Sequence, residues 1–278
     1  MNIHKIHINK DHIPLEKQKI KQVNLYGFKM KINEGHTLEY NLLKYPKYSF
    51  NLLDIHLRIK EKYPDHAIID VGANVGDTIA LIRSKSSNYI YSIEGNELYF
   101  KLLSINYTQF TNISLFNFFL NEVNESLSAN ISASRGTLHI IHENNGSKVD
   151  FITLDNLIIR NSIQNVKLLK IDTDGYDFKI IRGAYTFIET QKPIIFIEYD
   201  LNYLLKLNES EWDVFEKLSS IGYEDVYFYD NYGKFLIKLK LTDKLIIEQL
   251  TKYTLGEGVI KYFDICIPHK NDSDMVII

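Results

Sequence analysis

From about residue 64 onward, short apolar runs alternate with stretches whose apolar residues recur at helical spacing. The apolar runs predict strands at His66–Val71, Tyr89–Ile93, Ser114–Leu120, Val166–Ile171, Pro193–Glu198, Val226–Tyr229 and Tyr262–Ile267. The stretches between them predict helices at Asp77–Ser84, Glu97–Tyr107, Tyr176–Glu189, Glu209–Ile221 and Thr242–Tyr253. Apolar strands that alternate with helices are typical of a parallel sheet covered on both faces. We therefore predict an α/β fold with a mostly parallel sheet.

Two regions depart from this alternation. Residues 1–64 are rich in Lys, Asn, His and Tyr, and only Ser49–Lys62 has helical spacing, so we expect a helical or irregular extension ahead of a domain at 65–278. This extension could cap the substrate side or form a dimer contact. The second region, Asn121–Asp155, is rich in Asn and Ser and contains one strand-like run, Thr137–His142. An insertion that follows a strand end is where substrate contacts collect.

The composition limits the class of protein. The net charge of −3 and the scattered lysines argue against nucleic acid as a partner. A single cysteine, Cys266, fits a reducing compartment. The basic, polar first residues do not resemble a signal peptide, and no apolar run reaches the ~18 residues of a membrane span. We expect a cytoplasmic protein with no membrane span, whose oligomeric state, a homodimer included, the sequence leaves open.

The most informative segment is IIDVGANVGDT at residues 68–78, a strand followed by a glycine-containing turn and a helix start. A dinucleotide fingerprint counted from Gly72 would need glycines at 74 and 77, where this chain has Asn74 and Asp77. Acids at the loop would also repel a pyrophosphate. The pattern favours a cationic ligand without phosphate, such as S-adenosylmethionine. Capping of the helix by Asp77 alone is the plainer alternative. The candidate cofactor-binding residues of this loop are Asp70, Gly72, Asn74, Gly76, Asp77 and Thr78.

A second candidate is Glu94, which ends the next predicted strand 22 positions after Gly72. In nucleotide-binding α/β folds an acid at about 20 positions accepts hydrogen bonds from ribose hydroxyls. Taken alone, Glu94 would be a solvated acid at a strand end. Its distance from the glycine loop favours the ribose role.

Acids also end two later strands. Asp172 and Asp174 follow Val166–Ile171, and Glu198 ends the run at Pro193–Glu198. Asp174 could instead cap the next helix together with Asp177. A carboxylate cluster at one sheet edge can raise the pKa of a member, hold a divalent metal or bind substrate hydroxyls, and the sequence does not choose among these.

Five motifs, in order, resemble the FkbM-type S-adenosylmethionine-dependent methyltransferases. They are IIDVGANVGDT at 68–78, SIEGNE at 92–97, FITLDNL at 151–157, LKIDTDGYDFKIIRGA at 169–184 and PIIFIEYD at 193–200. The resemblance spans roughly residues 45–268 and implies a Rossmann-like class I methyltransferase fold, with six parallel strands and one reversed strand. Two positions depart from the family pattern, since Asp174 stands where glutamate is common and Gly95 where proline is common.

The resemblance also implies roles. The glycine-loop residues would hold the methionine part of S-adenosylmethionine, Glu94 the ribose, and Asn121 would lie near the adenine. The implied reaction is O-methyl transfer to a hydroxyl, with a saccharide or glycan precursor as the expected acceptor. Asp172 and Asp174 are the expected catalytic residues, as a base or as ligands of a divalent metal. Apart from the resemblance, Tyr176, Glu198 and His36 are the candidate acceptor contacts, and a surface histidine is the plainer alternative for His36.

Tyrosine-rich composition supports a polyhydroxylated acceptor, because tyrosine packs on sugar faces and forms hydrogen bonds. The alternatives are a non-sugar secondary metabolite as the acceptor, or a non-catalytic cofactor-binding protein with the same fold. An NAD-dependent oxidoreductase is disfavoured by Asn74 and Asp77 in place of glycines.

Overall fold

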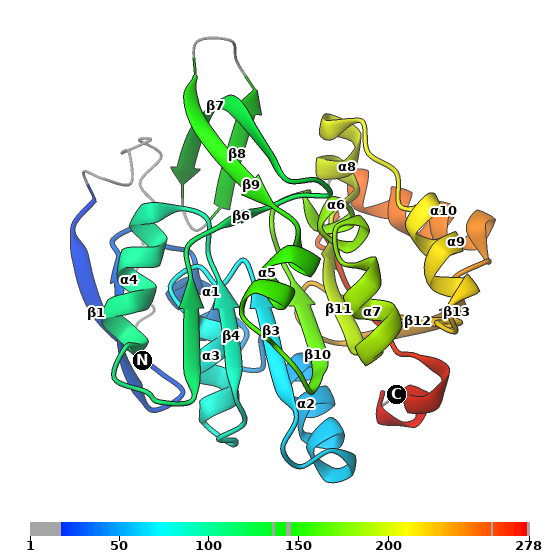
Figure 1. Cartoon of the computed structure of the whole chain (residues 1–278), viewed down its shortest axis with the longest axis horizontal. Helices are drawn as coiled ribbons and strands as arrows, with labels where there is room; N and C mark the ends of the chain where they lie inside the picture. Colours follow the sequence, from blue (N-terminus) through cyan, green and yellow to red (C-terminus); the bar gives the residue numbers. More distant parts are fainter. Residues whose placement is uncertain (1–17, 135–136, 143–145, 257, 277–278) are drawn as a thin grey trace.

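The computed structural model describes residues 18–134, 137–142, 146–256 and 258–276. In this part of the chain an eight-stranded sheet has the order β13-β12-β14-β11-β10-β3-β4-β5 (Figure 1). Its strands are β3 (Ala67–Val71), β4 (Ile90–Ile93), β5 (Ile113–Phe116), β10 (Val166–Ile171), β11 (Ile194–Tyr199), β12 (Asp225–Asp230), β13 (Phe235–Lys240) and β14 (Phe263–Ile267). Six strands run the same way, whereas β14 and β13 are antiparallel to their neighbours. The predicted mostly parallel sheet is confirmed.

The sheet has one more strand than the sequence analysis predicted. The addition is β13, which pairs with β12 through a turn in which the Asp230 side chain accepts hydrogen bonds from the Tyr232 and Lys234 N–H groups. Most of β13 is exposed at the sheet edge and it carries two lysines, so the apolar run typical of a buried strand is absent. The predicted strand Ser114–Leu120 is also divided, because β5 and β6 (Phe119–Leu120) belong to different sheets.

Helices cover both faces of the sheet, and alternate residues of each strand supply the two cores. In β3, Ile69 and Val71 face one core, to which the helices at residues 154–160, 177–191 and 212–220 contribute. Ile68 faces the other core, to which the helices at residues 50–62, 77–83 and 97–107 contribute. The predicted helix Tyr176–Glu189 is broken at Gly183, where a Cβ would lie 2.4 Å from the Asn121 carbonyl oxygen. The helices are α1 (Leu38–Lys44), α2 (Phe50–Lys62), α3 (Asp77–Arg83), α4 (Glu97–Tyr107), α5 (Leu154–Arg160), α6 (Asp177–Arg182), α7 (Tyr185–Gln191), α8 (Leu201–Leu207), α9 (Trp212–Ser220) and α10 (Lys244–Lys252), with 3₁₀ turns η2 (Tyr253–Leu255) and η3 (Lys270–Met275).

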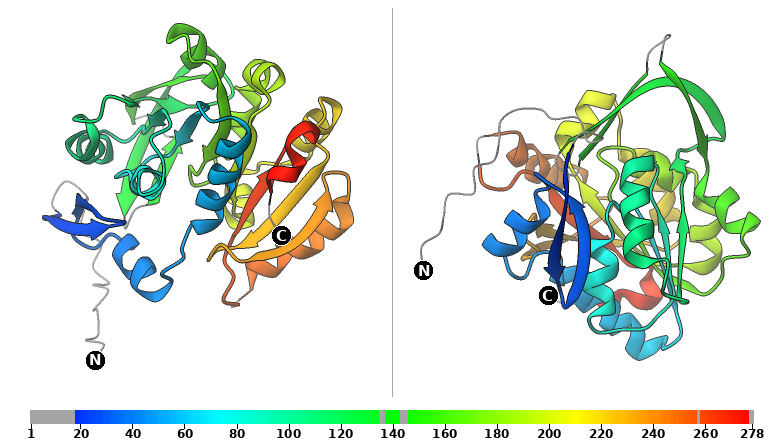
Figure 2. Two further views of the ribbon diagram at one scale, coloured as in Figure 1. Left: turned by 90° about the horizontal axis from the view of Figure 1, so that it is seen from below. Right: turned by 90° about the vertical axis from the view of Figure 1, so that its left-hand side faces the viewer.

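The extension before residue 64 contains a β-hairpin in addition to helices. Strands β1 (Ile20–Leu25) and β2 (Phe28–Asn33) pair through Tyr26–Gly27 and lie beside α4 (Figure 2). Met30 and Ile32 of the hairpin are buried in the same core as α2, α3 and α4. This packing fixes the following segment, residues 34–49, over the sheet edge near the glycine loop.

The insertion after β5 forms a second sheet, of order β6-β9-β7-β8, where the sequence predicted loops and one strand. Its strands are β6, β7 (Glu125–Ser134), β8 (Thr137–His142) and β9 (Ser147–Ile152), and the predicted strand coincides with β8. The β7–β8 hairpin projects beyond the main sheet (Figure 1). Phe151 and Val149 of β9 are buried in the main core, so the insertion is packed against the fold at its base.

The strand order reverses direction between β3 and β10. From β3 the chain adds β4 and β5 on one side, and later β10 and β11 on the other. In open α/β sheets the crevice outside the carboxyl ends of the strands at such a reversal is the usual ligand site. The topology therefore places the candidate site at residues 72–78, 94–96 and 172–177.

Candidate cofactor and acceptor site

A cavity of about 280 Å³ lies at this reversal point. Its walls come from the loops after β3, β4 and β10, from the end of β11, from Phe118–Leu120 of the insertion, and from residues 36–48 of the N-terminal extension. A smaller cavity of about 40 Å³ adjoins it, and both are lined by Tyr48, Lys170 and Glu198. We call the larger space the central cavity.

The glycine loop takes a conformation that requires its glycine. Gly72 has φ +74°, and a Cβ there would lie 1.8 Å from the Asp172 carbonyl oxygen of the neighbouring loop. The Gly76 backbone is also left-handed and precedes α3, with the Tyr107 ring packed against it. Because Gly72 has no side chain, the loops after β3 and β10 can contact each other directly. This contact brings Asp172 next to the glycine loop.

Glu94 holds the glycine loop from the next strand. One carboxylate oxygen accepts a hydrogen bond from Asn74 N–H at 2.8 Å, and the other accepts one from Asn96 N–H at 2.7 Å. The side chain is 6% exposed, and burial raises the pKa of Glu94 to about 7. Because each oxygen keeps a second acceptor position, the carboxylate can bind two ligand hydroxyls while it holds the loop.

Aromatic side chains form the wall beyond Glu94. Phe118, Phe119 and Tyr176 line the cavity, and the Tyr176 ring is stacked on Phe151 of the insertion with centroids 6.1 Å apart. A Cβ on Gly95 would meet the Phe119 ring at 2.2 Å, so Gly95 lets this ring lie against the strand end. This wall offers a flat apolar surface of the kind on which a base can pack.

His36 reaches the glycine loop from the N-terminal extension. Its Nδ1 accepts a hydrogen bond from Leu38 N–H at 3.1 Å, so its Nε2 carries the proton and donates to Asn74 Oδ1 at 3.2 Å. Burial lowers the pKa of His36 to about 4, which leaves the ring neutral at physiological pH. His36 therefore connects the extension to the loop as a neutral hydrogen-bonding group.

Beneath the cavity floor, Asp70 and Lys170 form a buried ion pair. Asp70 is 0% exposed and Lys170 is 6% exposed, and Lys170 Nζ lies 3.2 Å from Asp70 Oδ1 and 3.3 Å from Asp172 Oδ2. Burial by itself lowers the pKa of Lys170, but the carboxylates of Asp172, Asp70 and Asp77 raise it well above its usual range. The ammonium is therefore a permanent positive charge between the strand ends.

The acids after β10 lie at the other end of the cavity. The turn at Asp172–Gly175 is held by Asp177, whose carboxylate accepts hydrogen bonds from Thr173 and Gly175 N–H at 3.1 Å each. Asp177, rather than Asp174, is thus the acid that stabilises this turn. Asp174 has a left-handed backbone with φ 52°, and its side chain is hydrogen-bonded to Tyr203 of α8.

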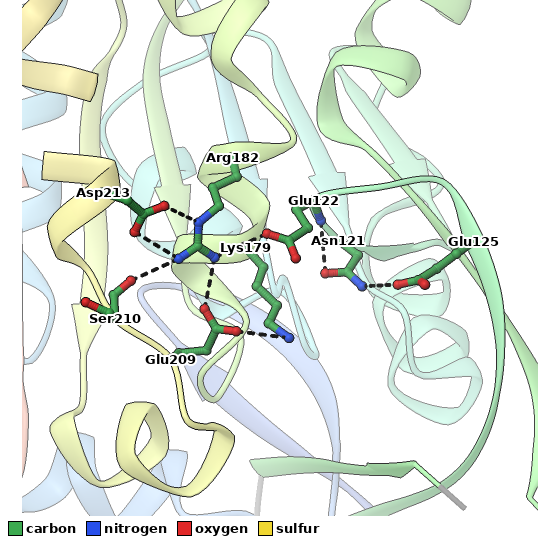
Figure 3. A network of polar contacts seen from close by, with 8 residues as sticks. All are labelled: Asn121, Glu122, Glu125, Lys179, Arg182, Glu209, Ser210 and Asp213. Carbon is green, nitrogen blue, oxygen red and sulfur yellow. Dashed lines mark hydrogen bonds and ion pairs between the residues drawn. The ribbon is translucent and has the colours of Figure 1, made fainter. Parts of the chain in front are cut away.

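The central cavity brings together nine of the thirteen residues that the sequence singled out: His36, Gly72, Asn74, Asp77, Glu94, Asp172, Asp174, Tyr176 and Glu198. The other four lie outside its lining. Asp70 is buried under the floor, Gly76 is packed on Tyr107, and Thr78 lines the smaller cavity. Asn121 is buried and donates to Glu125 while accepting from Glu122 N–H (Figure 3), so its amide is used within the insertion.

Several cavity residues were missed by sequence reasoning. Tyr48 and Tyr262 line both cavities, and their hydroxyl oxygens are 3.2 Å apart. They come from the two ends of the described chain, so no local pattern links them. Lys170 does carry a signal, because a lysine within the apolar run of β10 needs a buried partner.

The carboxyl groups of the cavity favour a cationic ligand, because a nearby cation stabilises their ionised forms. Its lining carries five carboxyl side chains, on Asp77, Glu94, Asp172, Asp174 and Glu198, against one ammonium, on Lys170. Among the described residues, no group of three or more His, Cys, Asp or Glu side chains is arranged to hold a metal ion. Nor does that part of the chain contain a helix long and apolar enough to cross a membrane.

The sheet order, the glycine loop and the acid after the second parallel strand define a Rossmann-like fold of the class I methyltransferase type. The family model described as "Methyltransferase FkbM domain" matches residues 70–224, which is more than half of the chain. The chain therefore belongs to the FkbM methyltransferase domain family. No curated protein matches it.

Solved structures that resemble the chain do so at low identity. Methyltransferase FkbM from Methylobacillus flagellatus KT is 17% identical, with a TM-score of 0.39, over 56% of this chain and 37% of that one. The precorrin-6y C5,15-methyltransferase from Geobacter metallireducens GS-15 is 14% identical, with a TM-score of 0.39, over 79% of this chain and 86% of that one. Trm5b from Pyrococcus abyssi is 10% identical, with a TM-score of 0.41, over 90% of this chain and 55% of that one. The chain thus spans little more than a third of the length of the first of these proteins.

Proposed function

We propose that this protein is an S-adenosylmethionine-dependent O-methyltransferase that acts on a hydroxyl of a saccharide or glycan precursor. The observation that carries the proposal is the central cavity, which joins the Glu94-bound glycine loop at one end to Asp172 and Asp174 after β10 and to Glu198 of β11 at the other. This continuous space supports the proposal because a nucleoside could bind at one end of it and hydroxyl groups at the other.

The cofactor would lie along the glycine loop. Glu94 would accept hydrogen bonds from the ribose hydroxyls with the acceptor positions that the backbone N–H groups leave free. The aromatic wall of Phe118, Phe119 and Tyr176 would cover the adenine, and Asp77 would face the methionine ammonium. The excess of carboxyl groups favours this end, with its sulfonium and ammonium charges, over a phosphate. When bound, S-adenosylmethionine supplies an electrophilic methyl group.

The acceptor would enter at the opposite end. Asp172, Asp174 and Glu198 can accept hydrogen bonds from sugar hydroxyls, and Tyr48 and Tyr262 can donate or accept them. Alignment of the two reactants is the main contribution expected from the protein, since such positioning can supply about 7–11 kcal/mol of the barrier. Residues 34–49 of the N-terminal extension, which include His36, would exclude water from the methyl group.

The experiment is methyl transfer from S-adenosylmethionine with a deuterated methyl group, followed by mass spectrometry of the acceptor. The probes are methyl glycosides of common hexoses and deoxyhexoses, with flavonoid and polyketide alcohols as the non-sugar set. We expect a labelled ether on at least one glycoside. Labelling of the non-sugar set alone would overturn the saccharide assignment. If no acceptor of either set is methylated, the result would count against the enzyme activity.

A further inference from the structure

Three neighbouring strands bring acids to the same level of the sheet. In the parallel register Ile171 of β10 faces Ile197 of β11, so Asp172 lies one step beyond, beside Glu198. In the antiparallel register Glu198 faces Asp264 of β14 directly. Directly paired residues of an antiparallel ladder point to the same face, with Cβ atoms about 4.5–5.5 Å apart. Glu198 is therefore the middle member of a row of three carboxyls.

The outer two members of this row have stabilising partners. Asp172 Oδ2 lies 3.3 Å from the Lys170 ammonium, and its side chain is 45% exposed to water. Asp264 Oδ2 accepts a hydrogen bond from Asn51 Nδ2 at 3.2 Å. Glu198 lines the central cavity and the smaller one, between these two acids.

The groups that face Glu198 make its ionised form costly. Burial raises the pKa of Glu198 well above its ordinary value, and the carboxylates of Asp172, Asp174, Asp177 and Asp264 raise it further. Tyr48, from the α1–α2 connection, and Tyr262, before β14, line the same two cavities as Glu198. The nearby cation is Lys170 on β10. From α8, the Tyr203 side chain is hydrogen-bonded to Asp174. An acid held in this way is a stronger base when ionised than an exposed one.

We propose that Glu198 takes the proton of the acceptor hydroxyl during methyl transfer, an assignment that rests on the proposed function. In this step the acceptor oxygen forms a bond to the methyl carbon, and the bond between that carbon and sulfur breaks. Its electron pair remains on sulfur, which becomes a neutral thioether. The O–H proton moves to a Glu198 oxygen and is released to solvent after the product leaves. Asp172 and Asp174 then orient the acceptor.

The test does not depend on knowing the acceptor. Protein labelled with ¹³C at the glutamate carboxyls is titrated by NMR, and Glu198→Gln identifies the Glu198 signal by removing it. Glu216→Gln, on the exposed surface of α9, is the matched control for the substitution. The titration is repeated with S-adenosylmethionine, which carries a sulfonium charge, and with S-adenosylhomocysteine, which lacks it.

A nearby sulfonium should stabilise the ionised form, so S-adenosylmethionine should lower the Glu198 midpoint by about 1–3 pH units, and S-adenosylhomocysteine by much less. Equal shifts with the two compounds, or an ordinary midpoint in the free protein, would overturn the assignment. Binding of neither compound would overturn the proposed function itself, so the two failures are distinguishable. Asp264→Asn removes one like charge and should lower the midpoint in the free protein.

A kinetic experiment follows on any methylated glycoside. Glu198→Gln should lower kcat about 10²–10⁴-fold with an unchanged Kd for S-adenosylmethionine. Asp264→Asn should retain activity and move the acidic limb of the pH profile to lower pH, a shift that a merely structural role would not produce. Full activity of Glu198→Gln would remove this residue from proton transfer.

Discussion

Replacing Lys170 with Met should destabilise the protein strongly, because it leaves the Asp70 carboxylate buried without its nearest cation. Asp70 is 0% exposed, and Lys170 Nζ lies 3.2 Å from its Oδ1. Methionine is close in length to lysine, so little volume is lost. Removal of one partner of a buried ion pair costs about 3–5 kcal/mol. The free energy of unfolding, measured by urea denaturation followed by circular dichroism at pH 8, should fall by this amount.

The pH dependence of the loss identifies its cause. Burial already raises the pKa of Asp70, and loss of Lys170 would raise it further. A carboxyl whose pKa is raised by folding contributes stability that is fully present below its pKa in the unfolded state, about 3.9. This stability is lost as the pH rises through its pKa in the folded state. In Lys170→Met the defect should therefore be large at pH 8 and smaller near pH 5. The Lys170 contribution in the native protein is constant over this window, since its pKa is raised above the ordinary lysine value.

The double variant Asp70→Asn/Lys170→Met is the matched control. It removes both charges and should recover most of the lost stability. Two results would refute the reasoning: a Lys170→Met protein as stable as the native one at pH 8, or a defect of equal size at both pH values. A double variant no more stable than Lys170→Met would show that packing, and not the unpaired charge, causes the loss.

Three further predictions concern the loop, the buried acids and the network around α6. Gly72→Ala should lower the free energy of unfolding by about 2–5 kcal/mol, because the new Cβ would clash with the Asp172 carbonyl oxygen and the backbone is left-handed. Gly27→Ala is the control: its φ is +90°, but a Cβ would meet no atom within 4 Å, so it should cost only the backbone strain of about 1–2 kcal/mol. The melting temperature of the ligand-free protein should rise as the pH falls from 8 to 6, because a carboxyl with a raised pKa contributes stability that is lost as the pH rises through its folded pKa. Burial raises the pKa values of Glu94, Asp177 and Asp264 to about 7, and it also raises those of Asp70, Asp77 and Glu198. These six acids outnumber the four histidines with lowered pKa values, His36, His56, His66 and His269, which act in the opposite direction. A melting temperature that falls over this range would contradict the prediction. Arg182→Gln should lower the free energy of unfolding by about 1–3 kcal/mol in urea denaturation. The reason is that Arg182 joins α6 to Asp213 of α9 and also contacts residues 209–210 and 122 (Figure 3). An unchanged midpoint of urea denaturation would show that the network is not stabilising.

Local patterns were sufficient to predict the central part of the fold. The β3 and β10 runs are mostly apolar, with Asp70 as the charged residue of β3 and with Lys167 and Lys170 in β10. Gly72 and Glu94 follow the runs of β3 and β4 directly, and the turn at Gly72 needs a glycine because it approaches the next loop closely. These features are encoded by residues near one another in the chain. The predicted family and the parallel sheet are accordingly confirmed.

Features that depend on distant packing could not be predicted. β13 is an exposed edge strand, and β7 and β9 of the insertion are rich in polar residues, so none of the three shows the hydrophobic run of a buried strand. Tyr48 lines the cavity from the N-terminal extension, whose β1–β2 hairpin packs against α4, and no local sequence pattern indicates this position. The row formed by Asp172, Glu198 and Asp264 depends on the strand order β10-β11-β14, which the sequence alone does not contain.

The central claim, that the cavity binds S-adenosylmethionine, is tested most directly by calorimetric titration of the native protein with S-adenosylmethionine, S-adenosylhomocysteine and NAD in parallel. We expect saturable binding of the two adenosyl compounds and none of NAD, because the glycine loop is bordered by acids that favour a cation and repel a pyrophosphate. Binding of NAD alone, or of none of the three, would contradict it.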